Sequence, residues 1–298
     1  MNVLVEGAAL RIKLVWAEPL IDNSILIAVL GAAVLNAGWN SAVKIGGDRV
    51  VVMAMVTFAG SLASLLVFPF TVMPAAACWP LLVLSIGVHT AYHFMLPIAY
   101  NHGDLGQVYP IARGSAPLLV TICAAVIFGE VPSVFALLGV IILAGGVIYT
   151  AFGRRGQADT KTIVFSLATG LLIACYTVVD GAGARMSGSA FGFAVLLTIG
   201  DGVATLIIVL WWKGASIFRM DQKTIALCSV AGMMQISAYW IAVWALARAP
   251  MGSVSALRET SVLFVALIST FILRERVGID RIVTAVLVCI GIGLIRIS

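Results

Sequence analysis

The chain has 298 residues, of which 62% are hydrophobic and only 10% are charged, and its mean hydropathy is +1.12. Soluble domains have roughly 45–50% apolar and about 25% charged residues, so this composition excludes an ordinary soluble protein and predicts an all-α integral membrane protein. The net charge of +5 does not indicate a nucleic-acid partner, because the basic residues lie mostly in loops between apolar segments. The five cysteines are scattered without a CxxC pair, so no metal site is predicted.

A membrane-spanning helix needs about 20 mostly apolar residues, and ten segments of this kind follow one another along the chain. In order they are 24–43, 50–70, 80–100, 106–128, 133–152, 162–181, 190–212, 225–246, 252–273 and 277–297. Residues 1–23 form an N-terminal segment that lacks the apolar core of a signal peptide. A polar linker, 153–161, divides the ten helices into two sets of five, 24–152 and 162–298.

The two sets are predicted to be inverted repeats, because an odd number of helices makes the second set enter the membrane in the opposite direction. At a constant spacing of 145 residues, Arg258 repeats Arg113 and Gly291 repeats Gly146. Secondary transporters are often built in this way, with the substrate held at the interface of the repeats. The alternative is that the repeat serves folding alone.

Arg113 and Arg258 lie inside apolar segments, in the fourth and ninth predicted helices. A charge at the centre of a bilayer costs roughly 2.5–3.5 kcal/mol, so such residues usually face a cavity. Pro110 removes a helix hydrogen bond, which predicts a break or kink beside Arg113. A guanidinium matches a carboxylate or phosphate, so Arg113 is predicted to be the principal anion-binding group. Alternatively, Arg113 is a structural ion-pair partner of Glu259.

Five of the predicted helices carry polar and aromatic side chains three or four residues apart, which places each set on one helix face. These sets are Asn36, Trp39 and Asn40; His89, Tyr92 and His93; Tyr109 and Arg113; Tyr176 and Asp180; and Gln235 and Tyr239. Lipid disfavours such faces, so they are predicted to turn inward around one central cavity, together with Arg258 and Glu259, and to bind the substrate. The alternative is packing between helices, with the polar atoms bonded to neighbouring carbonyl groups.

Asp201 is the carboxylate nearest the middle of a predicted helix, and Gly200 and Gly202 flank it. It is a candidate for proton coupling, because intramembrane carboxylates often form proton relays. The alternatives are a permanently protonated side chain or a tilted helix that brings the carboxylate to the membrane surface.

Several strings resemble the EamA type of the drug/metabolite transporter superfamily: LNAGWNSAVKIGGD, YNHGDLGQVYPIARGSAPLL, FGE, YTVVDGAGAR and LRE. The resemblance runs from about residue 24 to the end, and GDLGQVYPIARG is its most specific part. It implies a ten-helix carrier of two inverted five-helix repeats that moves small metabolites such as amino acids. It also implies no metal and no covalent cofactor.

We therefore expect a secondary transporter that moves an amino acid or organic anion by alternating access, in a bacterial cytoplasmic membrane. Its expected partners are the small-molecule substrate and the lipid bilayer, with a proton as a candidate coupling ion and no nucleic acid. Two alternatives stay open, a passive channel and an intramembrane enzyme. The enzyme is disfavoured, because the chain has no GxSxG motif and neither YD nor GxGD.

Overall fold

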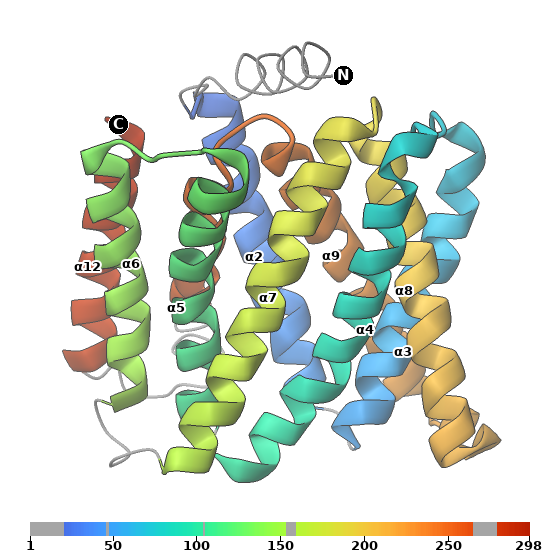
Figure 1. Cartoon of the computed structure of the whole chain (residues 1–298). Helices are drawn as coiled ribbons and strands as arrows, with labels where there is room; N and C mark the ends of the chain where they lie inside the picture. Colours follow the sequence, from blue (N-terminus) through green and yellow to red (C-terminus); the bar gives the residue numbers. More distant parts are fainter. Residues whose placement is uncertain (1–20, 46–47, 104, 153–158, 265–278) are drawn as a thin grey trace.

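The computed structural model describes residues 21–45, 48–103, 105–152, 159–264 and 279–298 (Figure 1). Within these ranges the chain is helical, without strands. The helices are α2 (Asn23–Ile45), α3 (Arg49–Val67), α4 (Trp79–His102), α5 (Leu105–Cys123), α6 (Val134–Phe152), α7 (Thr160–Met186), α8 (Ala190–Lys213), α9 (Gln222–Leu246), α10 (Met251–Arg258) and α12 (Ile279–Arg296). Short 3₁₀ turns cover Phe68–Phe70, Ala76–Cys78 and Ala215–Phe218, and a π-helical turn covers Ala124–Phe128.

Eight helices, α2 to α9, are long and apolar enough to cross a membrane, so the protein is a multi-pass integral membrane protein. They match the first eight segments predicted from the sequence. The ninth predicted segment, 252–273, extends beyond the described residues, and the tenth corresponds to α12. Most of the N-terminal segment and most of the linker also lie outside the described residues.

The helix ends follow from local side-chain chemistry. Asp48 precedes α3 and its carboxylate accepts hydrogen bonds from the backbone N–H groups of Val50 and Val51. Asp159 caps α7 in the same way. Gly214 ends α8 with a φ of 70°, a conformation that glycine adopts without steric cost. The polar loops therefore begin where the sequence changes from apolar to capping residues.

The bundle has two unlike ends, and we call the end that carries the start of α2 and the end of α12 the terminal face. The Arg296 guanidinium donates to the Ile21 carbonyl and to the Asn23 side-chain oxygen, both at 2.7 Å. This contact joins the first and last of the described helices. In Figure 1 the C-terminus lies at the same end as the start of α2.

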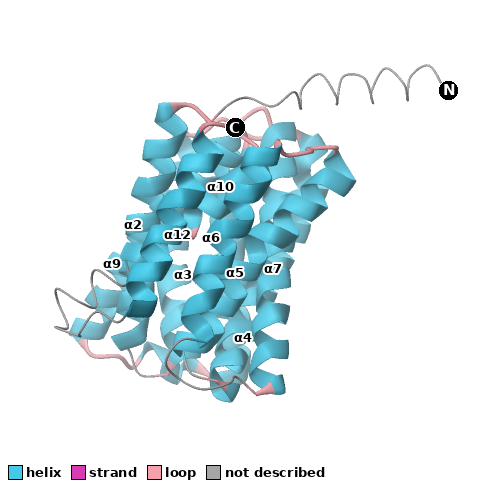
Figure 2. Ribbon diagram, turned by 90° about the vertical axis from the view of Figure 1, so that its left-hand side faces the viewer, coloured by secondary structure: helices cyan, strands magenta, loops and turns pink. Residues whose placement is uncertain are grey.

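The helices pair across the bundle in a regular way. Helices α6 and α12 pack together on one side, and α3 packs on α8 at the opposite side (Figure 1). Between them α4 packs on α7, α2 packs on α9, and α5 lies between α6 and α7. Figure 2 views the bundle from the side of α6 and α12. A Cβ added to Gly139 would lie 2.7 Å from the Gly291 carbonyl oxygen, so this pair of helices is in backbone contact.

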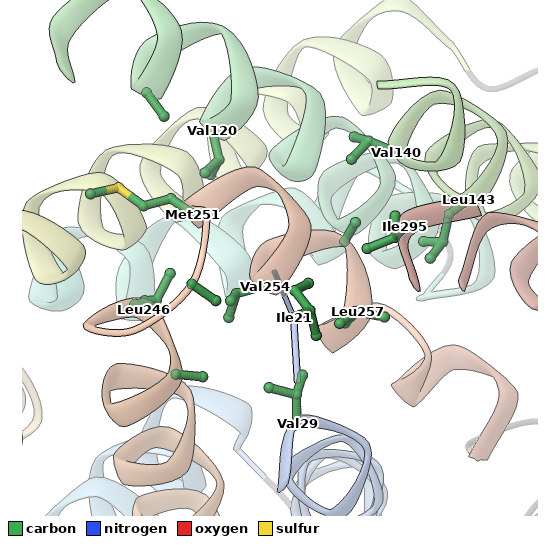
Figure 3. Close-up of a cluster of buried hydrophobic side chains, with 14 of the residues drawn as sticks. Ile21, Val29, Val120, Val140, Leu143, Leu246, Met251, Val254, Leu257 and Ile295 are labelled. Carbon is green, nitrogen blue, oxygen red and sulfur yellow. The ribbon is translucent and has the colours of Figure 1, made fainter. Parts of the chain in front are cut away.

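The short helix α10 is enclosed by apolar side chains of its neighbours. Met251, Val254 and Leu257 are fully buried, and α10 packs against α2, α5, α6, α7 and α9 (Figure 3). The neighbours in this cluster include Val29, Val120, Leu143, Leu246 and Ile295. Apolar packing therefore fixes the position of α10, and with it the position of Arg258 at its end.

The predicted break beside Arg113 is wrong. Helix α5 continues through Pro110 and Pro117 to Cys123. The interruption lies instead beside Arg258, where α10 ends in a turn at Glu259 and Thr260 and helix resumes at residues 261–264. A proline removes only one hydrogen bond, whereas the backbone N–H groups of Glu259, Thr260, Val262 and Leu263 each bond a carbonyl three residues back instead of four.

Candidate functional site

A central cavity of about 750 Å³, including the space at its opening, lies among the helices. Side chains of α2, α3, α4, α5, α7, α8, α9 and α10 line it. Eleven of the residues predicted from the sequence are among them: Asn36, Trp39, His89, Tyr92, His93, Arg113, Tyr176, Asp201, Gln235, Tyr239 and Arg258. Four do not line it: Asn40, Tyr109, Asp180 and Glu259.

The polar side chains of α2 are bonded to one another. Trp39 Nε1 donates to Asn36 Oδ1 at 2.9 Å, which fixes the indole against the cavity. Asn40 Nδ2 donates to the Asn36 carbonyl at 2.7 Å. The Asn40 amide therefore bonds the backbone of its own helix, at the carbonyl four residues back, and does not line the cavity.

Arg113 is buried and ion-paired. Its Nη1 lies 3.4 Å from Glu259 Oε1, and its guanidinium carbon lies 5.4 Å from the centre of the Tyr109 ring. Tyr109 therefore supports the guanidinium from behind instead of lining the cavity. Among the described residues, the Tyr109 hydroxyl and Glu259 Oε2 are buried without a hydrogen-bond partner. The hydrogen-bonding capacity around the Arg113–Glu259 ion pair is therefore not fully used, which is unusual for buried polar atoms.

Arg258 has a different environment, although it repeats Arg113 in the sequence. It lines the cavity from the last turn of α10. No acidic oxygen of the described residues lies within ion-pair distance of it. Glu259 follows it directly but points to Arg113, because successive helical side chains diverge by about 100°. Arg258 is therefore a cavity cation whose hydrogen-bonding groups are available.

Asp180 is fully buried behind the cavity wall and joins three helices. His89 Nε2 of α4 lies 3.1 Å from Asp180 Oδ2, and the Tyr239 hydroxyl of α9 donates to the same oxygen at 2.7 Å. Ser85 donates to the other oxygen. The His89 ring stacks on Tyr176 with 4.0 Å between the ring centres.

Asp201 lies on α8 and contacts α4. His93 Nδ1 lies 3.4 Å from Asp201 Oδ1 and 3.2 Å from the Thr205 hydroxyl. Thr90 and Thr205 each donate to Asp201 Oδ1 at 3.4 Å. These bonds are long, so this group is held more loosely than the one around Asp180.

The hydroxyl residues that hold the two acidic groups were missed from the sequence. Their spacing could have found them, because each lies three or four residues from a predicted polar residue on the same helix. Ser85 precedes His89 by four residues, and Thr90 precedes His93 by three. Within the described part of the chain, no three His, Cys, Asp or Glu side chains are grouped so that they could hold a metal ion.

A second buried group of charges, the terminal cluster, lies at the terminal face and consists of Glu130, Arg185 and the backbone of residues 246–251. Arg185 Nη1 is ion-paired with Glu130 Oε1. The same guanidinium donates to the carbonyls of Leu246 at 2.8 Å and Ala249 at 2.7 Å. The other Glu130 oxygen accepts from the Met251 N–H at 2.9 Å. The cluster joins the loop after α5, the end of α7 and the start of α10.

Comparison with known proteins relates the chain to a transporter family. Residues 160–297 match the EamA-like transporter family. A WAT1-related protein of Arabidopsis thaliana, At5g13670, is 30% identical over 104 residues, which are 34% of this chain and 28% of that protein. A crystal structure of another protein superposes with a TM-score of 0.71 over 92% of this chain and 96% of the other, at 14% identity, which shows a shared fold.

Proposed function

We propose, from the premise that the chain carries an EamA-like transporter domain in residues 160–297, that the protein is a secondary transporter of a small organic anion or amino acid. The observation that carries the proposal is Arg258, a cavity-lining cation without an acidic partner among the described residues. A carboxylate is the ligand that a guanidinium fork binds with matched geometry. Aromatic rings of the same cavity would pack the apolar part of the substrate.

We further propose alternating access between two inverted halves, 24–152 and 162–298. The packing of the helices supports this arrangement, because α4 on α7 corresponds to α9 on α2 when the halves are exchanged. The pairs α3 with α8 and α6 with α12 correspond to themselves under the same exchange. Arg113 and Arg258, which are 145 residues apart, both line the cavity. Such a relation is expected of carriers that rock one repeat against the other.

The two arginines would contribute unequally to binding of the substrate carboxylate. The sequence predicts Arg113 as the principal anion-binding group, but the charge of Arg113 is partly neutralised by Glu259 at 3.4 Å. We therefore assign the substrate carboxylate first to Arg258, with Arg113 as a neighbouring donor. We assign the apolar contacts to Trp39 and Tyr92, which line the same cavity.

The test is uptake into liposomes that contain the purified full-length chain, with radiolabelled phenylalanine and N-acetylphenylalanine as probes. The probes share a ring and a carboxylate, and only the first carries an ammonium group. We expect saturable uptake and counterflow of at least one probe, with the apparent affinity reduced at least about tenfold in Arg258→Gln and less in Arg258→Lys. Arg248→Gln is the matched control, because Arg248 is exposed and lies against Trp244 outside the cavity.

Three results would contradict the proposal. Flux that does not saturate and shows no counterflow would indicate a channel. Conversion of a probe without flux would indicate an enzyme. Equal apparent affinity in the Arg258→Gln variant, normalised to folded protein by gel filtration, would remove Arg258 from the site.

A further inference from the structure

The two cavity histidines of α4 have unlike surroundings. His89 contacts the Asp180 carboxylate at 3.1 Å and stacks on Tyr176 at 4.0 Å. His93 Nδ1 lies 3.2 Å from the Thr205 hydroxyl and 3.4 Å from Asp201 Oδ1, so its carboxylate contact is the longer of the two. A carboxylate bond and an aromatic face both favour the positively charged imidazolium. His89 is therefore better placed than His93 to hold a proton.

The partners of Asp180 identify the nitrogen that would gain the proton. The Tyr239 hydroxyl donates to Asp180 Oδ2 and Ser85 donates to Oδ1. Because hydroxyl groups donate to both oxygens, Asp180 is arranged as an ionised acceptor. His89 Nε2 lies 3.1 Å from Oδ2 and 3.3 Å from the Tyr239 hydroxyl, and with the Nε2–H directed to Oδ2 the nitrogen that would bind a further proton is Nδ1.

The formal charges around the cavity point to the same group. Arg113 and Arg258 are positive, whereas Glu259, Asp180 and Asp201 are negative, so neutral histidines leave one net negative charge. A bound monoanion would raise this to two negative charges in a site of low dielectric constant, which is unfavourable. One proton on a histidine restores the charge of the empty cavity. Binding of the anion should therefore favour binding of a proton, and the reverse.

We propose that His89 is the proton-binding group of this cavity and that each organic monoanion is carried together with one proton held on His89. The proposal rests on the transport function proposed above. It moves the coupling proton from Asp201, the candidate predicted from the sequence, to a histidine of α4 that lines the same cavity. The titratable and charged groups facing His89 are Asp180 and Tyr176 of α7, Tyr239 of α9, Asp201 of α8, Tyr92 and His93 of α4, Arg113 of α5, and Arg258 and Glu259 at the end of α10.

The position of His89 also explains how a proton could influence alternating access between the two halves. His89 belongs to the first half of the chain, whereas Asp180 and Tyr239 belong to the second half. A protonated His89 makes an ion pair between the halves, and loss of the proton leaves a weaker hydrogen bond from a neutral ring to the Asp180 carboxylate. Protonation would therefore favour the arrangement of the halves in which this contact exists.

The first test needs no measurement of transport. The chain has only three histidines, His89, His93 and His102, so nitrogen-15 NMR of the histidine-labelled protein in nanodiscs resolves each ring. Single histidine-to-glutamine variants assign the signals. We expect the His89 signals to show a protonated ring in the presence of N-acetylphenylalanine, and Asp180→Asn to remove this protonation by taking away the carboxylate at 3.1 Å. A His89 ring that stays neutral down to pH 5, or one that is insensitive to Asp180→Asn, would overturn the proposal.

The second test measures coupling in liposomes with N-acetylphenylalanine, a monoanion at neutral pH. In the wild type, an inward proton gradient of about tenfold should accelerate uptake several-fold, because the anion and the proton enter together. In His89→Gln this ratio should fall to one, whatever the remaining rate. His102→Gln is the matched control, since His102 stacks on Phe165 at the end of α4 outside the cavity.

The outcomes separate the two proposals. Saturable uptake that ignores the proton gradient in the wild type would overturn proton coupling and leave the carrier function standing. A gradient response that persists in His89→Gln and disappears in Asp201→Asn would place the proton at Asp201 instead. Absence of saturable uptake for both probes would overturn the carrier function and co-transport together, and would leave the NMR result as a test of proton binding alone.

Discussion

The protein has two buried groups of charges, and they are completed to different degrees. In the terminal cluster, Glu130 uses both oxygens, and the Arg185 guanidinium bonds a carboxylate and two backbone carbonyls. At the central cavity, Arg258 has no acidic partner among the described residues, and Glu259, which pairs with Arg113 but does not line the cavity, has one oxygen without a hydrogen-bond donor. Both groups are out of contact with bulk water to a similar extent, so burial alone does not distinguish them.

The difference lies in what is left for a ligand. A buried charge whose hydrogen bonds are all made within the chain fixes helices in place and has nothing to offer to a solute. A buried charge with unused hydrogen-bonding groups is costly until a ligand completes it. We therefore interpret the terminal cluster as structural and the charged residues at the central cavity as a binding site. This interpretation can be tested by substitution.

The largest effect should follow from breaking the terminal cluster. Arg185→Gln leaves Glu130 with a single backbone donor and two carbonyl groups without their guanidinium. Breaking a buried ion pair costs about 3–5 kcal/mol, so the variant should unfold at a markedly lower temperature than the wild type. Tryptophan fluorescence of the purified protein in detergent measures this. Arg258→Gln is the comparison, and equal destabilisation by both variants would contradict the division into structural and binding charges.

A smaller loss of stability, accompanied by a gain in ligand affinity, is expected when Glu259 is changed. Glu259→Gln keeps the shape of the side chain but removes the charge that faces Arg113. Stability should fall by about 1–3 kcal/mol, because Arg113 keeps only a neutral acceptor. At the same time the affinity for N-acetylphenylalanine should rise, by about tenfold for each 1.4 kcal/mol of attraction gained. Calorimetric titration checks this, and weaker binding would show that Glu259 orients Arg113 instead of neutralising it.

The smallest effect should come from a charge pair at the ends of two membrane spans, with Asp48 just before α3 and Lys213 at the last position of α8. Asp48 and Lys213 form an ion pair between the start of α3 and the end of α8. Both side chains are partly exposed, so Lys213→Met should cost only about 0.2–1 kcal/mol.

The pH dependence of this cost gives the pair a signature. The hydrogen bond from Lys213 lowers the pKa of Asp48 below its usual value. A carboxyl whose folded pKa is lowered contributes stability above its unfolded pKa of about 3.9 and loses it as the pH falls through the folded pKa. The cost of Lys213→Met should therefore be equal at pH 5 and pH 8 and shrink below about pH 4. A cost that grows under acid would contradict the assigned pair.

Periodicity predicted the helices well, because apolar segments of about 20 residues leave few alternatives. The inward-facing sets were also predictable, since polar side chains at positions such as His89 and Tyr176 cannot face lipid. The sequence could not decide which polar side chain completes which charge. Tyr109 and Asn40 lie on the predicted faces, yet one supports Arg113 from behind and the other bonds its own helix. Such choices depend on distances between helices, which the spacing along one helix does not contain.

The interruption of the ninth predicted helix illustrates the same limit. Proline is the strongest local signal for a break, and it is present beside Arg113 but not directly after Arg258. Helix α5 nevertheless tolerates Pro110 and Pro117, whereas α10 ends at Arg258 without a proline. Burial of α10 among its neighbours, and the contact of Glu259 with Arg113, are tertiary features that override the local preference.

The direction in which Glu130 points depends on the number of residues in the π-helical turn Ala124–Phe128. The turn holds one residue more than an α-helical turn would, and it ends at Gly129, directly before Glu130. Removing any single residue from it would restore α-helical winding and rotate Glu130 by about 100° away from Arg185. The number of residues in this turn is therefore what holds α5, α7 and α10 together at the terminal face.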